Sequence, residues 1–189
     1  MLTSRLARLT LSAFALAAVG AAHAAVPGPD YVSSPAHSTL TYTFTQAGAA
    51  NHGVFKSFSV QFDPRAKTLE VVIDMRSFDT HDAQRNALLA GAQFFDVARY
   101  PQARFTATQL HKTPSGYIAT GPLTLRGITR TVSVPFTWRL LGRSGGELQG
   151  KTVIERLAFG IGQGEWHATE WLGNPVTVRF ALRMVPAAH

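Results

Sequence analysis

Apolar and polar residues alternate along about eight segments of this chain. In the first segment, threonines separate Leu40, Tyr42 and Phe44. This period of two is typical of a β-strand with one face in water and the other against a core. The segments are 40–44, 58–62, 69–75, 105–107, 117–125, 132–138, 148–156 and 176–184. The pattern therefore predicts a protein built mainly from half-buried strands.

The alternation stops at residues 82–90, which have the composition of a short helix rich in alanine and leucine. Asp79 or Thr80 can cap the start of this helix. The charge of Asp82 favours the N-terminal end of the helix dipole, and Gly91 suits the C-terminal end. We therefore predict one short helix within an otherwise all-β chain.

Short turns separate the predicted strands. Asp63-Pro64, the Pro-Ser-Gly sequence at 114–116 and the Gly-containing loop at 143–146 are turn sequences. About eight strands joined in this way predict an antiparallel sandwich or barrel. A closed barrel of eight strands has an interior that side chains can fill, or that can hold one small ligand.

The N-terminal segment is predicted to be a signal peptide. Arg5 and Arg8 precede an apolar run at 9–19, and Ala22-His23-Ala24 matches a cleavage pattern of small residues. The alternative is a membrane anchor, but the run is shorter than the roughly 20 residues that a spanning helix needs. We therefore assign residues 1–24 to the signal peptide and residues 25–189 to a single domain.

Charge and cysteine content limit the kinds of binding partner and chemistry that the protein can have. The chain has a formal net charge of +7 and no cysteine, so disulfides and thiolate chemistry are excluded. The basic residues are scattered, whereas nucleic-acid binding favours clustering, so we predict no nucleic-acid partner. Export without disulfides fits a bacterial periplasm. A weak attraction to anionic lipid headgroups is consistent with the net positive charge.

No reactive constellation stands out in the sequence. The histidines have no metal-binding spacing, and no G-x-S-x-G nucleophile motif occurs. We predict no metal site, no catalytic residue and no cofactor other than a bound isoprenoid lipid or quinone. An enzyme that modifies a bound isoprenoid lipid or quinone remains the alternative. A third hypothesis is an outer-membrane barrel, against which stand a C-terminus without a terminal aromatic strand and arginines at 139, 179 and 183.

Aromatic residues occupy many predicted dry positions. For each one, packing in a filled core is the simpler interpretation, yet together they suit an apolar tunnel. Burying hydrocarbon contributes about 0.8 kcal/mol per methylene, so a five-carbon isoprene unit is worth roughly 3–4 kcal/mol before entropy losses. The alternation alone leaves open whether the interior is full or hollow.

Six short motifs occur in a specific order over residues 38–185. They are G-x-F at 53–55, S-x-D-T-x-x-x-x-R at 77–85, F-F-D-V at 94–97, Y-P-x-x-x-F at 100–105, G-x-L-T-L-R-G-x-T at 121–129 and R-x-x-F-G-I at 156–161. With these motifs the chain resembles the YceI-like family of periplasmic lipid- and isoprenoid-binding proteins. The resemblance implies a lipocalin-like barrel that holds a polyisoprenoid chain, such as an isoprenoid quinone, in an apolar tunnel for transport, storage or stress response. It also suggests a homodimer.

The resemblance and the alternation together give a set of candidate ligand-binding residues. These are Tyr42, Phe44, Phe58, Phe62, Phe94, Phe105, Leu123, Phe136, Trp138, Ile154, Phe159, Trp166, Val178 and Phe180. Arg85 and Arg156 are candidates for a headgroup contact, with a structural ion pair as the alternative for each. The family helix usually reads R-D-x-H-L, whereas this chain has Arg85-Asn86-Ala87-Leu88-Leu89, so a role of that Asp and His is in doubt here.

Overall fold

The computed structural model describes residues 30–188. The predicted signal peptide, residues 1–24, lies outside the described residues. The strands are β1 (Tyr31–Ser33), β2 (Thr39–Gln46), β3 (Ala49–Phe55), β4 (Phe58–Asp63), β5 (Thr68–Asp74), β6 (Phe78–Asp79), β7 (Gln102–Thr106), β8 (Gln109–Thr113), β9 (Gly116–Leu125), β10 (Ile128–Leu140), β11 (Gly146–Glu155) and β12 (Pro175–Pro186). The α-helix of the described part is α1 (Ala83–Ala90), and the short 3₁₀ turns are η1 (Pro35–His37), η2 (Met75–Ser77), η3 (Gly142–Ser144), η4 (Arg156–Phe159) and η5 (Gly164–His167).

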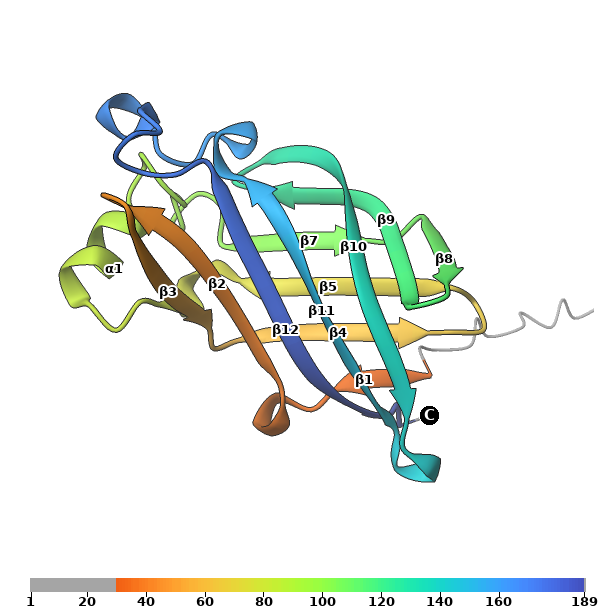
Figure 1. The fold of residues 1–189 in the computed structure, drawn as a ribbon. Coiled ribbons are helices and arrows are strands. Elements are labelled where there is room, and N and C mark those ends of the chain that lie inside the picture. Colours follow the sequence, from red (N-terminus) through yellow and green to blue (C-terminus); the bar gives the residue numbers. More distant parts are fainter. Residues whose placement is uncertain (1–29, 189) are drawn as a thin grey trace, which may run out of the picture.

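These twelve segments form a closed barrel of eight antiparallel courses, which confirms the predicted fold class (Figure 1). A course is here one passage of the chain along the barrel wall. Four of the courses consist of two strands each, namely β1 with β2, β3 with β4, β5 with β6, and β7 with β8. The two strands of such a course pair with the same neighbouring course. β9, β10, β11 and β12 are single, and β12 pairs back onto β1 and β2. Each course therefore pairs with the next one in sequence, and the last closes on the first.

The predicted number of eight strands matches the eight courses of the barrel. The prediction missed four of the twelve strands, β1, β3, β6 and β8. β3 has the sequence AANHGVF, whose first residues have low β-propensity, and its pairing with β2 holds it extended. The predicted strands 69–75 and 148–156 each ended one residue later than the observed strands β5 and β11. Met75 begins η2 and Arg156 begins η4, where the chain leaves the barrel wall.

The helix prediction was right within one residue, but its N-cap was wrong. Asp82 is the cap, because its Oδ1 accepts a hydrogen bond from the Arg85 amide at 2.9 Å. Asp79 and Thr80 contact Asn86 instead. The Asn86 amide group donates to Asp79 Oδ1 at 2.9 Å, while its oxygen accepts from the Thr80 hydroxyl at 2.7 Å. Asn86 therefore fastens α1 to the end of β6.

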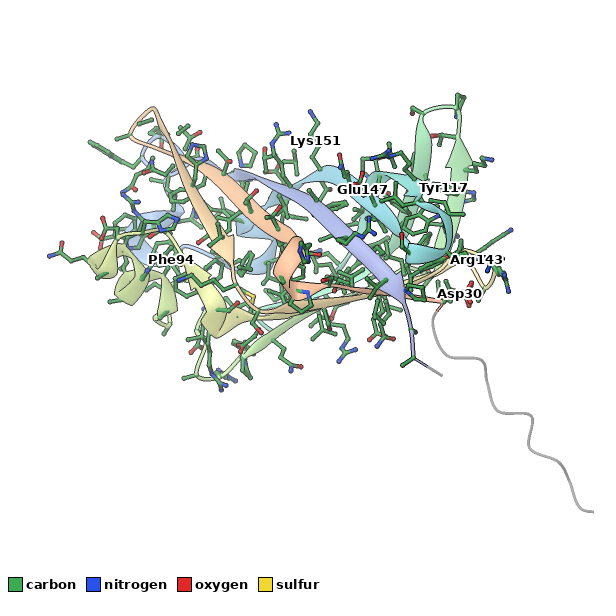
Figure 2. All side chains as sticks on the ribbon, turned by 90° about the horizontal axis from the view of Figure 1, so that it is seen from below. Asp30, Phe94, Tyr117, Arg143, Glu147 and Lys151 are labelled. Carbon is green, nitrogen blue, oxygen red and sulfur yellow. The ribbon has the colours of Figure 1, made fainter. Side chains whose placement is uncertain are left out.

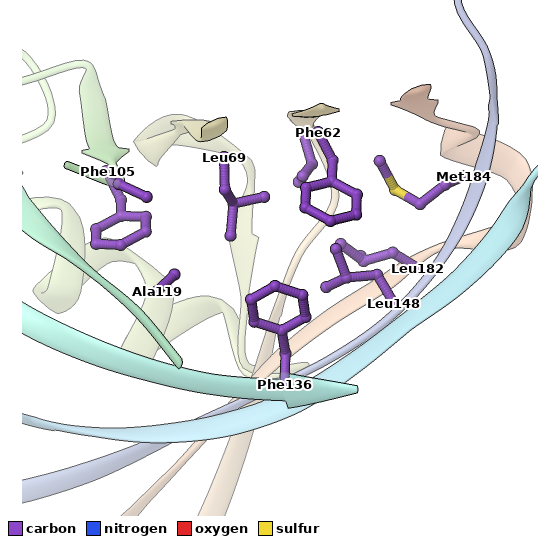
Figure 3. Packing of buried hydrophobic residues seen from close by; sticks show 10 residues of the cluster. Phe62, Leu69, Phe105, Ala119, Phe136, Leu148, Leu182 and Met184 are labelled. Atoms are coloured by element: carbon purple, nitrogen blue, oxygen red, sulfur yellow. The ribbon is translucent and has the colours of Figure 1, made fainter. Parts of the chain in front are cut away.

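Two apolar clusters fill the two ends of the interior. The first lies between β4, β5, β7 and β9 to β12 and includes Phe62, Phe136, Leu148, Leu182 and Met184, all nearly inaccessible to water (Figure 3). The second lies at the α1 end and contains Tyr42, Phe44, Leu89, Phe94 and Leu172. Side chains on the opposite face of the same strands are mostly polar, so the alternation seen in the sequence separates core from solvent.

The α1 end is closed by helix and loops. Within the described residues, β6 pairs with β3 alone, and α1 with the residues that follow it fills the remaining gap. The loop around η4 and η5 joins this covering, since the amides of Gly162 and Gln163 both donate to the Gln93 carbonyl at 2.8 and 2.9 Å. We call residues 80–100 and 156–174 the cap.

The anchor of α1 gives stability a specific dependence on pH. Hydrogen bonds from Lys56, Asn86 and the His81 amide hold the pKa of Asp79 well below its ordinary value of 3.8. Because the folded-state pKa is lowered, this stabilisation is fully present above about 3.8 and is lost as the pH falls from there through the folded-state pKa. We expect the free energy of unfolding of the natural protein to exceed that of Asp79→Asn at neutral pH, and the difference to shrink below pH 3.8.

Urea denaturation of both proteins between neutral pH and pH 3 measures this difference, because carboxylates common to both proteins cancel. A difference that stays constant with pH would show that the Asp79 charge does not fasten the cap.

Candidate functional site

A cavity runs through the barrel between the two apolar clusters. Twenty-nine residues border a volume of only about 200 Å³, so the cavity is long and narrow. Its wall is formed by β2 to β5, β7 and β9 to β12, together with Met75 of η2 and residues of the cap. No polar atom is exposed on this wall. We call it the barrel cavity.

Alternation within the strands makes the wall apolar, and a hydrogen bond within the wall satisfies the hydroxyl of the inward-facing Thr152. Val132 and Val134 point inward from β10, while the intervening Ser133 points outward and is exposed. Thr152 is an inward-facing residue with a polar group, and its hydroxyl donates to the Ser133 carbonyl at 3.0 Å. The hydroxyl is thereby used by the wall, so that its methyl group is available to the cavity.

Many of the predicted ligand-binding residues border this cavity. They are Tyr42, Phe44, Phe58, Phe94, Phe105, Leu123, Ile154, Val178 and Phe180. Five others lie outside its wall: Phe62, Phe136, Trp138, Phe159 and Trp166. The structure gives the position of the nine predicted residues that border the cavity. Their role in ligand binding remains a prediction.

Three of the five others close one end of the barrel. The rings of Phe62 and Phe136 meet edge-on with centroids 5.8 Å apart (Figure 3). The Trp138 ring centroid lies 5.2 Å from that of Phe62. Tyr117 stacks on Phe136 at 5.5 Å. Such packing is typical of a filled core, so aromatic residues at inward positions serve as a plug at this end and as a wall further along.

Phe159 and Trp166 belong to the cap. Phe159 is buried in the second cluster, and Trp166 packs on Phe94 with ring centroids 5.5 Å apart. Phe94 lies at the α1 end of the molecule in Figure 2. Phe94 itself borders the cavity, so Trp166 packs against a residue of the cavity wall without lining the cavity.

Arg156 is buried in the cap at 3% exposure, with its guanidinium bonded to backbone carbonyls. Nε donates to Gly173 at 3.0 Å, Nη1 to Ile161 at 2.8 Å and Gly162 at 3.4 Å, and Nη2 to Leu172 at 2.7 Å. Burial lowers the pKa of this guanidinium from its ordinary value of 12.5, yet arginine stays charged in proteins. The side chain therefore fastens the two ends of the η4–η5 loop to each other.

Tyr42 brings a polar group next to the cavity without a partner. Its hydroxyl is buried and has no hydrogen-bond partner in the described part of the chain. Gly53, directly opposite on β3, leaves the space that the ring occupies, because a side chain there would overlap the Tyr42 ring. Burial raises the pKa of the hydroxyl, and the nearby Asp79 charge adds to this rise, so the group is a proton donor at all ordinary pH values.

Arg85 lies half-buried on α1, one turn before the buried Leu89. Its guanidinium is 3.9 Å from the Asp82 carboxylate, and 29% of its side chain is exposed. The structure therefore separates the two headgroup candidates: Arg156 is held inside the cap, while Arg85 lies at its surface.

The sequence analysis missed much of the cavity wall. Aliphatic strand residues such as Val71, Val132 and Val176 border the cavity, and their inward positions could have been read from the alternation. Leu89, Phe95, Ile161 and Leu172 come from the cap, where no period of two marks the inward side. Only their apolar character could have indicated them.

The described residues contain no group of three histidine, cysteine or acidic side chains arranged to hold a metal ion. Within the same residues, no helix has the length and apolar character required to span a membrane.

Solved structures share this barrel. BcnA of Burkholderia cenocepacia is 34% identical, with a TM-score of 0.73 over 79% of this chain and 98% of that chain. A domain from Saccharophagus degradans, described as polyisoprenoid binding and implicated in plant cell wall breakdown, has a TM-score of 0.69 at 17% identity over 84% of this chain and 99% of that chain. At that identity the likeness concerns the fold.

Several curated relatives carry the family name UPF0312. A UPF0312 protein of Yersinia enterocolitica is 38% identical over 88 residues, which is 44% of this chain and 46% of the relative. The chain thus spans about half the length of the curated relatives that it matches. A family model described as YceI-like domain matches residues 31–184, nearly all of the barrel. The chain therefore belongs to the YceI-like domain family, as its ordered motifs predicted.

Proposed function

We propose that this protein holds a polyisoprenoid chain, such as an isoprenoid quinone or a similar lipid, in the barrel cavity. The observation that carries this proposal is a long, narrow cavity with no polar atom exposed on its wall. A single hydrocarbon chain fits such a space, whereas a polar or broad ligand would lose its hydrogen bonds to water without replacement. The description of the Saccharophagus degradans domain as polyisoprenoid binding points to the same ligand class.

The energetics favour a long chain without an ionic anchor. Each methylene that leaves water contributes about 0.8 kcal/mol, so a few isoprene units supply enough free energy for tight binding before ordering costs. The ligand's polar end then belongs at the α1 end of the cavity. There the Tyr42 hydroxyl offers a buried donor without a partner, and Arg85 lies at the surface of the cap.

The cellular role that we propose is transport, storage or stress-related sequestration of this lipid in the periplasm. It rests on the apolar cavity and on the signal peptide predicted at residues 1–24. The homodimer suggested by the family resemblance remains a prediction.

The first test is the identity of the bound molecule. The mature protein is purified from its native compartment without detergent, extracted with organic solvent and examined by mass spectrometry. We expect an isoprenoid lipid in stoichiometric amount. A folded protein that carries no lipid, and whose melting temperature does not change with any isoprenoid or fatty acid added, would rule out the proposal.

A second test fills the cavity. Val132→Trp places an indole on the cavity wall, and Thr131→Trp places the same ring on the exposed side of the same strand. We expect the Val132 variant to lose most of its co-purifying lipid while it remains folded, since overpacking costs about 1–3 kcal/mol. The Thr131 variant should keep its lipid. Equal lipid content in both folded variants would place the ligand elsewhere.

A third test separates the structural role of Arg156 from a headgroup contact. Arg156→Met keeps much of the side-chain volume but removes the bonds to the carbonyls of Ile161, Leu172 and Gly173. We expect the lipid-free variant to be destabilised by about 2–4 kcal/mol, because buried carbonyls lose charged donors. Urea denaturation of the lipid-free protein measures this loss. Unchanged stability with weakened lipid binding would instead identify Arg156 as a headgroup ligand.

A further inference from the structure

One outer wall of the barrel is basic. Five of the six cationic side chains of β10, η3, β11 and β12 form this wall: Arg139, Arg143, Lys151, Arg179 and Arg183. The sixth, Arg130, lies near the start of β10 and donates to the Ala158 carbonyl of the cap. The acidic residues of the same strands are Glu147, which pairs with Arg139 at 2.5 Å, and Glu155. We call this surface the basic face. Lys151 lies on the outside of the wall in Figure 2, and Arg143 lies at the end opposite Phe94.

Two like charges stand side by side at its centre. Lys151 on β11 is the direct partner of Arg179 on β12, and both are exposed. No ion pair of the described residues includes either of them. Like charges directly opposite each other on neighbouring strands destabilise a sheet. The repulsion between Lys151 and Arg179 therefore destabilises the isolated protein. A bound anion would reduce this repulsion.

The surroundings of this pair suit an anionic oxygen. Lys151 and Arg179 border a shallow depression together with Thr39, Thr41, Gln149 and Ala181. The hydroxyl and amide groups add hydrogen-bond donors to the two charges, and Ala181 leaves the floor free of a large side chain. A phosphate group on a lipid fits this combination of charge and donors.

Exposed apolar side chains accompany the charges. Val153 lies two positions after Lys151 on the same face of β11 with 55% exposure. Trp171, 69% exposed, lies beyond the end of β2, where its carbonyl accepts a hydrogen bond from Ala47. Basic residues combined with Trp and aliphatic side chains are typical of surfaces that bind the membrane interface.

We propose that the basic face docks on a lipid bilayer that contains anionic headgroups. The inference rests on the proposed function, because a carrier of a membrane lipid has to meet a membrane to load and unload. A second copy of this chain is disfavoured as the occupant, since two such faces brought together would repel each other. The opposite side of the same strands borders the barrel cavity through Thr152, Val178 and Phe180, so docking places the cavity wall next to the membrane.

The test is co-sedimentation of the mature, full-length protein with vesicles. Vesicles of phosphatidylcholine are compared with vesicles that also contain phosphatidylglycerol. We expect binding to the anionic vesicles alone, and weaker binding at high salt, which screens exposed charges. The double variant Lys151→Glu/Arg179→Glu should reduce the partition coefficient about tenfold or more, since each basic residue near an anionic surface contributes on the order of 1 kcal/mol.

The matched control makes the same charge change elsewhere. Arg76→Glu/Lys112→Glu alters two exposed residues of η2 and β8, away from the basic face, and should bind vesicles like the natural protein. Equal losses in both variants, or no preference of the natural protein for anionic vesicles, would overturn the proposal.

Lipid extraction of the same samples separates the two hypotheses. Co-purified isoprenoid without vesicle binding would refute the docking face and leave the proposed function intact. Vesicle binding that depends on Lys151 and Arg179, by a protein with an empty cavity, would support the face as a membrane contact and contradict the isoprenoid cargo.

Discussion

Closure of the hydrogen-bonded sheet is the constraint on which the rest of this structure depends. Once β12 pairs with both β1 and β2, the wall of strands has a continuous inner face that water cannot wet from the side. Inward positions are then apolar or have their polar group satisfied by the wall, as the Thr152 hydroxyl is, and the buried Tyr42 hydroxyl is the exception in the described part of the chain. Ring closure thus explains both the regular alternation in the sequence and the apolar character of the cavity.

The same constraint makes the cap the place where polar groups meet the cavity. Strands cannot cover the end of their own barrel, so helix and loop residues do, and their backbone carbonyls need donors away from water. Arg156 supplies these donors to the η4–η5 loop, and Asn86 with Asp79 fastens α1. Asn86 can make both contacts because its amide nitrogen donates to Asp79 while its amide oxygen accepts from the Thr80 hydroxyl.

The strand faces could be predicted from the sequence, whereas the division of the interior could not. Period-two alternation identifies Phe136 and Phe180 alike as inward, because both obey the same rule. The structure separates them: Phe136 meets Phe62 across the barrel and fills one end, whereas Phe180 borders open space. That difference depends on which side chain faces each residue across the barrel. The facing side chain is set by how the sheet closes, and the sequence of a single strand does not reveal it. The cap residues Leu172 and Ile161 escaped prediction because their loop has no period at all.

Alternation also gives a single strand two separate chemical tasks. In β12, Val178 and Phe180 border the cavity, and Arg179 between them points to solvent beside Lys151. Because neighbouring residues face opposite sides, the charge on the outer surface can change without a change in the cavity wall, and the reverse also holds. A lipid carrier needs an interior that excludes water and an exterior that distinguishes a membrane from solution. In a closed barrel of half-buried strands these two requirements are met by alternate residues of the same strands, so the two surfaces can be tested, and can have evolved, independently.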